Sequence, residues 1–420
     1  MPQADNRPLI ALIPLYITTF VLQGGSGLLI TLLTVRASRE GFSPTSIGLI
    51  GTTYFIGFLL GTLTATRLIA LVGHIRVFSA FAAIAAAGTL ALVLYIEPFA
   101  WMGIRFVMGF CFSSLFTVLE SWLNGAASNE ARGRVLSIYG FVDLCAATGS
   151  QLLLPVLGAD GFDAIAVTAI LLTLSLVPIA ITPTASPAAV SPRSTAFWGV
   201  WRISPLAFVG CFVVGLTNSA FRTVGPLYAH EIGLGIAGVA FFMSAGIAGG
   251  ALLQMPMGWL SDRYDRRTVM LFATACASIS GVVLAAFSGG SEYVAYGTAL
   301  MFGAFAMPLY SLSAAHANDR AKPDQYSTVA AGLLFTFAVG AAIGPVIGSL
   351  AINALGPAGL FVYIAFAHAS LIVYALIRMA VRTAVPREER VRYKPEMHPM
   401  PAGPVDYSQS SKETSLPAKA

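Results

Sequence analysis

Charge is scarce in this chain of 420 residues. Asp, Glu, Lys and Arg make up only 10% of the sequence, whereas 56% of the residues are hydrophobic. With a mean hydropathy of +0.77, the chain has far more apolar surface than a water-soluble fold can bury. The composition therefore excludes a soluble globular protein and indicates a protein of the lipid bilayer.

The residues that usually build disulfides, metal centres and nucleotide sites are also missing. The four cysteines, Cys111, Cys145, Cys211 and Cys276, each lie within an apolar run, which indicates small hydrophobic side chains rather than a disulfide framework. There is no Walker-type phosphate loop, no zinc-ligand cluster and no recognisable Ser-His-Asp motif. We therefore expect neither an enzyme nor an ATP-driven pump, and neither a metal nor a cofactor.

Long apolar segments dominate what is present. A helix rises 1.5 Å per residue and the hydrocarbon core is about 30 Å thick, so a spanning helix needs roughly 20 apolar residues. Twelve segments of the sequence meet this requirement, which predicts an all-α membrane protein of twelve transmembrane helices. They are 8–35, 44–66, 77–96, 98–123, 135–157, 164–182, 204–229, 236–260, 268–288, 293–315, 327–352 and 357–377.

The basic residues predict the orientation in the membrane. With the N-terminus in the cytoplasm, 20 of the 24 Lys and Arg residues fall on the cytoplasmic side, and only Arg36 and Arg39 fall outside. Because cytoplasmic loops are enriched in Lys and Arg, we expect both termini in the cytoplasm of a multi-pass protein of the cell inner (plasma) membrane. The net charge of +5 is spread over short loops, so we expect no nucleic-acid partner.

The twelve spans divide into two groups of six. Pro and Ser are frequent between them, and three residue pairs at corresponding places in the two groups, including Gly109 with Gly303, stand 194 positions apart. These features predict a duplicated bundle with the binding site between its halves. The expected boundaries are 1–182 for the first bundle, 183–203 for a cytoplasmic linker, 204–380 for the second bundle and 381–420 for a charged, Pro-rich and disordered cytoplasmic tail.

The most specific motif follows the eighth span. Residues 258–267 read Gly-Trp-Leu-Ser-Asp-Arg-Tyr-Asp-Arg-Arg, which resembles the Gly-x-Leu-x-Asp-Arg-x-Gly-Arg-Arg pattern of the major facilitator superfamily, with Asp265 in place of a glycine. In the first half the corresponding copy is eroded and retains only Arg76 of its basic cluster. The resemblance implies a cytoplasmic gate whose carboxylate and guanidinium groups pair across the face. The candidate gate residues are Gly258, Asp262, Arg263, Arg266, Arg267 and Arg76.

Other segments extend the resemblance over the whole membrane part. Arg105 and Gly109 form an Arg-x-x-x-Gly feature in the fourth span, and Glu120 begins a Glu-Ser-Trp-Leu-Asn segment that is similar to the YcaD-like branch of the superfamily. The resemblance implies the major facilitator fold, but it does not imply a substrate. Gly340, Gly344 and Pro345 in span eleven are similar to the glycine-proline motif of drug antiporters, although close helix packing explains them more simply.

Charges within the spans require an explanation, because each costs a few kcal/mol or more in the bilayer. Arg105 and Asp143 lie at similar calculated depths in consecutive spans, roughly 10 Å and 13 Å from opposite boundaries, which predicts that they pair or share a polar cavity. The pair is a candidate for proton coupling or for a static structural contact. Glu120, near the cytoplasmic end of its span, is a further candidate, either as a gate partner or as a ligand.

Polar residues within the spans are candidates for lining the substrate cavity. Arg222 suits an anionic substrate or an interfacial position, and each uncharged residue is a candidate for a ligand contact or for a bond between helices. The candidates are Gln23, Tyr54, Gln151, Asn218, Arg222, Gln254 and Asn318.

Together these features favour a secondary active transporter of a small solute, working by alternating access as a monomer and coupled to protons. We favour efflux by antiport over uptake by symport. Two alternatives stay open at this point: a facilitative uniporter, and a membrane-embedded solute sensor that signals through the tail.

Overall fold

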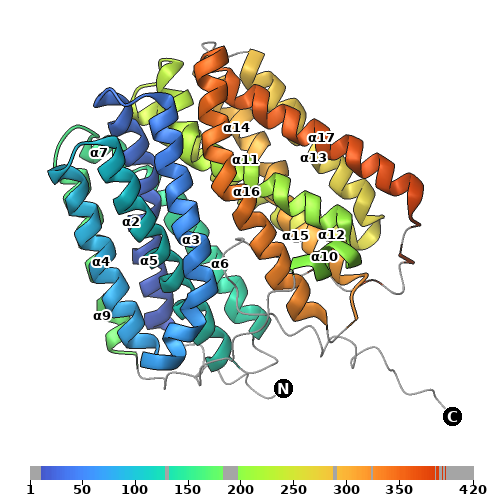
Figure 1. Ribbon diagram of the computed structural model, residues 1–420, viewed down its shortest axis with the longest axis horizontal. Coiled ribbons are helices and arrows are strands. Elements are labelled where there is room, and N and C mark those ends of the chain that lie inside the picture. The colour runs from blue at the N-terminus through green and yellow to red at the C-terminus, as the bar shows by residue number, and fades with distance from the viewer. Residues whose placement is uncertain are drawn as a thin grey trace, which may run out of the picture.

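The computed structural model describes residues 11–127, 132–182, 197–286, 291–322, 325–383, 385–386, 390 and 393. The described residues form helices and contain no strand. Twelve helical segments are long and apolar enough to cross a membrane, which confirms the predicted number of spans. Figure 1 shows two bundles side by side.

The first bundle contains spans one to six. Two of its spans are interrupted, one after Gln151 and one at Ser175. Its helices are α2 (Ile13–Arg39), α3 (Pro44–Val72), α4 (His74–Leu94), α5 (Pro98–Ala126), α6 (Arg132–Gln151), α7 (Leu154–Leu157), α8 (Asp163–Leu174) and α9 (Leu176–Ala180).

The second bundle repeats this arrangement with spans seven to twelve. A short helix precedes it within the predicted linker, and one span is interrupted near Pro308. The helices are α10 (Phe197–Ile203), α11 (Pro205–Glu231), α12 (Ile236–Arg263), α13 (Arg266–Ala286), α14 (Glu292–Ala306), α15 (Leu309–Asn318), α16 (Tyr326–Leu355) and α17 (Gly359–Val381). Most of the predicted tail and of the linker 183–203 lies outside the described residues.

Short capping sequences fix where several spans begin. Ser43, Glu97 and Ser204 each stand directly before a proline that starts a helix. Their side chains accept hydrogen bonds from the backbone N–H three residues on, at 3.2, 2.8 and 3.4 Å. The cap pairs one of the N–H groups that a helix start leaves free, and proline has no N–H to leave unpaired. These local sequence signals determine where each loop ends and the next helix begins.

Glycines allow α3 and α5 to touch along their backbones. A Cβ atom added at Gly57 would overlap the carbonyl oxygen of Phe106, and one added at Gly109 would overlap that of Tyr54. Only glycine permits this approach, because any other residue would push the two helices apart.

The second bundle has the same contact between α12 and α14. There a Cβ atom at Gly249 would overlap the carbonyl oxygen of Leu300, and one at Gly303 would overlap that of Gly246. Gly303 is the residue that stands 194 positions after Gly109, so the spacing that indicated a duplication marks equivalent helix contacts. In α16, Gly340 also lies against a backbone carbonyl, that of Phe212 in α11, which favours the packing interpretation of its glycine-proline segment.

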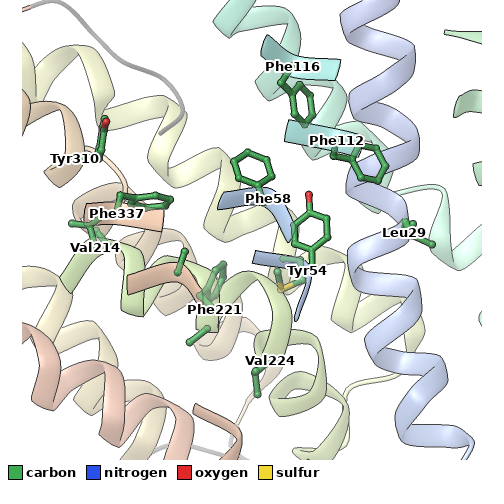
Figure 2. Packing of buried hydrophobic residues seen from close by; sticks show 14 of the residues in the cluster. Leu29, Tyr54, Phe58, Phe112, Phe116, Val214, Phe221, Val224, Tyr310 and Phe337 are labelled. Carbon is green, nitrogen blue, oxygen red and sulfur yellow. The ribbon is translucent and has the colours of Figure 1, made fainter. Parts of the chain in front are cut away.

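Aromatic side chains fill the space beside these contacts. Figure 2 shows Tyr54 of α3 between Phe58 of the same helix and Phe112 of α5, with ring centroids 6.2 and 6.3 Å away, while Phe221 of α11 packs in the second bundle. The ring centroids of Phe221 and Phe302 are 5.2 Å apart. Large buried rings of this kind contribute most of the packing area in a helical core.

Loops rich in arginine gather at one end of the bundle, which we call the basic end. It holds the loops after α3, α12 and α15 and the residues after α17, whereas the loops after α2, α11 and α16 lie at the opposite end. Figure 1 shows α3 and α16 close together at the opposite end and separated toward the basic end. Hydrogen bonds join the two bundles toward the opposite end: Asn353 to Thr45 (2.5 Å), Thr34 to the carbonyl of Thr223 (2.8 Å) and Ser244 to the carbonyl of Thr148 (3.3 Å).

The first span differs from its predicted range. The sequence placed Arg36 and Arg39 outside a helix ending at residue 35, but α2 continues to Arg39. Arg36 is buried, pairs with Glu40 at 3.3 Å and donates to the carbonyl of Gly161 at 3.1 Å. Arg39 also pairs with Asp160. Because Glu40 and the loop before α8 supply these partners, the last turn of α2 can hold two arginines.

The glycine contact between α3 and α5 gives a first prediction. Replacing Gly109 with Ala should destabilise the protein by about 1–3 kcal/mol, the usual cost of an overpacked core, because the new methyl group overlaps a backbone carbonyl that cannot rotate away. The thermal unfolding midpoint in detergent measures the effect. Gly103 on the same helix has open space around it, so Gly103→Ala is the matched control. Equal midpoints for the two variants would contradict the assignment.

Candidate functional site

A central cavity lies between the two bundles. It contains about 1320 Å³ of space that no atom fills, its opening to solvent included. Its walls come from α2, α3 and α6 of the first bundle and from α11, α12 and α16 of the second. Six of the seven polar candidates line it: Gln23, Tyr54, Gln151, Asn218, Arg222 and Gln254.

Asn318 does not line this cavity. It is the last residue of α15, at the basic end, and directly precedes Asp319, which belongs to a separate charged network. The sequence made it a candidate because it is an uncharged polar residue near the end of a predicted span, but the end of this helix lies too far from the middle of the bundle. The cavity prediction for Asn318 is therefore wrong.

Several oxygen atoms of the cavity residues are available as hydrogen-bond acceptors. In the part of the chain that the structure describes, no partner is found for Gln23 Oε1, Thr31 Oγ1, Gln151 Oε1 or Asn218 Oδ1, although all four are buried. Gln151 is held in place because its Nε2 donates to the carbonyl of Gly27 at 3.1 Å. Leaving a buried polar atom unpaired costs about 1–3 kcal/mol, so these four atoms favour a ligand that donates hydrogen bonds.

Arg105 has a different partner from the one expected. Its guanidinium lies over the ring of Tyr54, with Cζ 4.1 Å from the ring centroid, and among the ion pairs of the described residues it forms none with Asp143. Similar depth in the membrane was the only basis for that pairing, and depth does not determine the direction in which a helical side chain points. Arg105 instead faces α3, whose backbone is in contact with α5.

Asp143 and Glu120 both lie near Tyr139, and Asp143 also lies within electrostatic range of the cavity residue Arg222. Both carboxylates are buried, and the hydroxyl of Tyr139 donates to Glu120 Oε1 at 3.4 Å. Asp143 is one turn after Tyr139 on α6, so the three side chains share the region between α5 and α6. Two of the candidate coupling residues are thus brought together, and the third is placed elsewhere.

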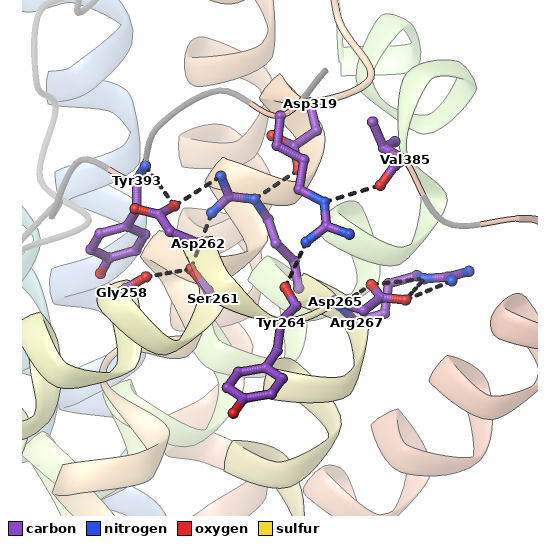
Figure 3. A network of polar contacts seen from close by, with 11 residues as sticks. Gly258, Ser261, Asp262, Tyr264, Asp265, Arg267, Asp319, Val385 and Tyr393 are labelled. Atoms are coloured by element: carbon purple, nitrogen blue, oxygen red, sulfur yellow. Dashed lines mark hydrogen bonds and ion pairs between the residues drawn. The ribbon is translucent and has the colours of Figure 1, made fainter. Parts of the chain in front are cut away.

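The gate motif forms a charged network at the basic end (Figure 3). Arg266 is central to it: its Nε donates to Asp319 Oδ2 at 2.7 Å, its Nη2 lies 3.3 Å from Asp262, and its Nη1 donates to Ser261 at 3.1 Å. The side chains of Arg266 and Asp319 are only 1% and 2% exposed. Asp319 was not among the sequence candidates.

All these partners belong to the second bundle. The resemblance had implied pairing across the face, but Arg266 ties α12, α13 and the end of α15 together within one half. Arg263 does not join the network, because it lies over the exposed ring of Trp259 at 3.9 Å. Arg76, in the first bundle, is exposed.

Asp265, where the family pattern has glycine, caps α13. Its Oδ1 accepts from the backbone N–H of Arg267 at 3.0 Å, and its Oδ2 pairs with Arg267 Nη2 at 2.7 Å. Burial by itself raises the pKa of the Asp265 carboxyl, but the hydrogen bonds and charge of Arg267, with the charge of Arg390, outweigh it and hold the pKa below its ordinary value. The departure from the pattern thus replaces a flexible turn with a helix cap.

Described residues of the C-terminal segment contact this network. The backbone N–H of Tyr393 donates to Asp262 at 3.0 Å, and Gln254 donates to the Tyr393 hydroxyl at 3.3 Å. The ring lies so close to Gly258 that a Cβ atom there would overlap it. Composition alone gave no reason to expect Tyr393 beside a cavity residue, because the tail lacks an apolar pattern.

The buried ion pair gives a second prediction. Asp319→Asn should destabilise the second bundle by about 3 kcal/mol, the lower part of the range for breaking a buried pair, because Arg266 and Asp319 are almost fully buried and pair at 2.7 Å, whereas Asp262 is partly exposed and lies 3.3 Å away. The control Arg263→Gln removes an exposed charge of the same motif and should change stability little. Thermal unfolding of both variants tests this, and a smaller loss for Asp319→Asn than for the control would refute it.

The model of the Major Facilitator Superfamily matches residues 15–252 and 207–412. An uncharacterized MFS-type transporter of Enterobacter sp. (strain 638) is 25% identical over 337 residues, which cover 80% of this chain and 87% of the relative. The uncharacterized MFS-type transporter YcaD of Escherichia fergusonii is 24% identical over 362 residues, covering 85% and 92%.

Solved structures share the fold. The nucleoside transporter NupG superposes with a TM-score of 0.76 at 13% identity, over 87% of this chain and 98% of that one. A bacterial homologue of the human lysosomal transporter Spinster, in an inward-facing and occupied conformation, gives a TM-score of 0.71 at 13% identity, over 93% and 99%. With its two six-helix bundles and its family match over nearly the whole length, this chain belongs to the major facilitator superfamily and is a multi-pass membrane transporter.

Proposed function

We propose that this transporter moves a small solute by secondary active transport with alternating access, coupled to protons and favouring efflux by antiport. The observation that carries the proposal is the central cavity, which both bundles line and which holds several buried acceptor atoms. Contacts between the bundles near the opposite end support a state that is closed there. A substrate screen in proteoliposomes is the direct test of transport.

The lining of the cavity favours a partly apolar solute that donates hydrogen bonds. Tyr54, Phe58 and Phe337 present rings, and Gln23 and Asn218 present free amide oxygens. Arg222 is the cation of the lining and would accommodate a solute with one negative charge. This combination suits a ring-containing solute with hydroxyl or amino groups.

The basic end is proposed to face the cytoplasm. The positive-inside rule supports this orientation, because the loops after α3, α12 and α15 and the C-terminal segment carry most of the arginines. It places both termini in the cytoplasm and the protein in the cell inner membrane. In that orientation the structure corresponds to an inward-open state.

Glu120, Tyr139 and Asp143 are proposed as the proton-coupling group. Two buried carboxylates near one phenol form a place where a proton can be held in one state and released in another. Arg105 is proposed to influence proton coupling only indirectly, because its guanidinium lies over the ring of Tyr54, which lines the cavity. A uniporter would use the same cavity without this group.

A sensor is the second candidate, since Tyr393 of the C-terminal segment contacts the cavity residue Gln254. Net solute flux by a protein truncated after Val381 would exclude signalling through the tail as the sole function.

Cross-linking gives the third prediction. Cysteines introduced by Thr45→Cys and Asn353→Cys, in a variant without the four native cysteines, should form a link that stops solute turnover, because the two side chains join the bundles at 2.5 Å. Reduction should restore turnover. Each single variant treated with the same oxidant serves as the control. Full turnover in the linked protein would rule out alternating access through this end.

Proton coupling gives the fourth prediction. Asp143→Asn should abolish solute accumulation driven by a pH gradient while exchange of labelled for unlabelled solute continues, because a neutral side chain cannot carry the proton. Glu292→Gln, which neutralises an exposed carboxylate at the opposite end, is the control. Gradient-driven accumulation that survives in Asp143→Asn would remove this residue from the coupling group without affecting the assignment of transport.

A further inference from the structure

A second, smaller cavity lies at the basic end and is lined mainly by arginine. It is formed where α11 begins, α13 begins, and α15 and α17 end, away from the central cavity. It contains about 230 Å³ of unfilled space, its opening included. The positively charged residues around it are Arg267, Arg320, Arg378 and Arg382, with His316 beside them.

The charges of this arginine pocket are only partly compensated. Arg267 pairs with Asp265. Arg320 donates to the carbonyl of Thr383 at 2.9 Å and Arg382 to that of Ile203 at 3.1 Å, and a carbonyl supplies no negative charge. Within the described residues, Arg320, Arg378 and Arg382 have no carboxylate partner.

Repulsion among these groups is visible at Arg320. Burial, together with the charges of Arg382 and Arg267, lowers the pKa of its guanidinium and outweighs the opposing charges of Asp319 and Asp265. Like charges held around one small space are unfavourable unless an anion lies between them. The arrangement therefore indicates a binding site for an anion rather than a set of independent loop charges.

The surroundings place the pocket at the level of lipid headgroups. Ile203, whose carbonyl accepts from Arg382, ends the short helix α10. On α10, Trp201 is 40% exposed and packs edge-on against Phe208, with ring centroids 5.3 Å apart. Exposed tryptophans of this kind are typical of the interface between membrane and water. The pocket thus opens where helix ends meet the headgroup layer.

We propose that the arginine pocket binds a phosphate group, carried by the headgroup of an anionic phospholipid or by a soluble phosphate. Guanidinium groups bind phosphate oxygens through paired, charge-assisted hydrogen bonds. A bound phosphate would hold the ends of α13, α15 and α17 together. Because Arg267 also secures Asp265 at the start of α13, the ligand would stabilise the gate motif in this arrangement.

The experiment uses the purified full-length chain in a neutral detergent. Its unfolding midpoint is measured against increasing phosphatidylglycerol, with phosphatidylcholine as the uncharged lipid, and separately against sodium phosphate, with sodium chloride at equal ionic strength. We expect phosphatidylglycerol to raise the midpoint at concentrations at which phosphatidylcholine does not. A rise produced by inorganic phosphate alone would support the same site and identify a soluble ligand.

Variants connect the effect with the pocket. Arg378→Gln should weaken the apparent affinity about fivefold, the effect of one interfacial charge, and the double variant with Arg320→Gln should weaken it further. The side chain of Arg378 forms no hydrogen bond or ion pair among the described residues, so we expect Arg378→Gln to fold. This single variant tests the proposal if the double variant does not fold. Arg67→Gln, at the basic end of α3 in the first bundle, is the matched control.

Two results would overturn the proposal. One is a wild-type midpoint that neither phosphatidylglycerol nor phosphate raises above its control. The other is a rise of the same size and affinity in Arg378→Gln and Arg67→Gln, which would trace the effect to general charge rather than to the pocket.

Discussion

Backbone contact at glycine is the constraint on which the arrangement of these helices depends. Gly57 and Gly109 bring α3 and α5 together, and Gly249 and Gly303 do the same for α12 and α14. These four glycines lie within the bundles. Between the bundles, Gly48 of α3 also lies against α16, where an added Cβ atom would overlap Ser349 and the carbonyl oxygen of Pro345, and Asn353 donates to Thr45. The contacts within each half support the proposed alternating access, in which each half moves as a unit and the surface between the halves separates and closes again.

The contact between Gly109 and Tyr54 also determines the surroundings of Arg105, the buried charge on α5. Tyr54, whose carbonyl lies against Gly109, also supplies the ring beneath Arg105. A cation over an aromatic face gains electrostatic stabilisation without a carboxylate, which matters most where solvent is excluded. Glycine packing thus places a buried arginine against Tyr54, a residue of the cavity wall.

Much of this arrangement was predictable from the sequence because the bilayer imposes simple rules. Span length, the loop arginines and the spacing of Gly109 and Gly303 indicated twelve helices in two halves, and polar residues such as Gln23 and Gln151 indicated a cavity. A polar side chain in the middle of a span avoids lipid, so it lies in the interior of the bundle. The depth of a residue in the membrane follows from its position within an apolar segment, so the sequence alone gives that depth well.

The sequence tells less about which neighbouring helix a side chain faces. Arg105 and Asp143 were matched by depth but point to different neighbours, and Asn318 lies at a helix end outside the cavity. Asp319 was missed as the partner of Arg266, because contacts between loops depend on how three helices end rather than on any local pattern. Tyr393 was missed for a related reason, since a single aromatic residue in a polar tail gives no periodic signal.

The closure at the opposite end has an energetic consequence. The hydrogen bonds from Asn353, Thr34 and Ser244 join uncharged groups, and each contributes about 0.5–1.5 kcal/mol. A ligand shifts the balance between two orientations only by the difference in its affinities for them. A solute that binds at micromolar concentration gains about 8 kcal/mol, so part of that energy is enough to open this end. Because uncharged bonds are hardly screened by ions, the resting orientation should also be indifferent to the salinity of the medium.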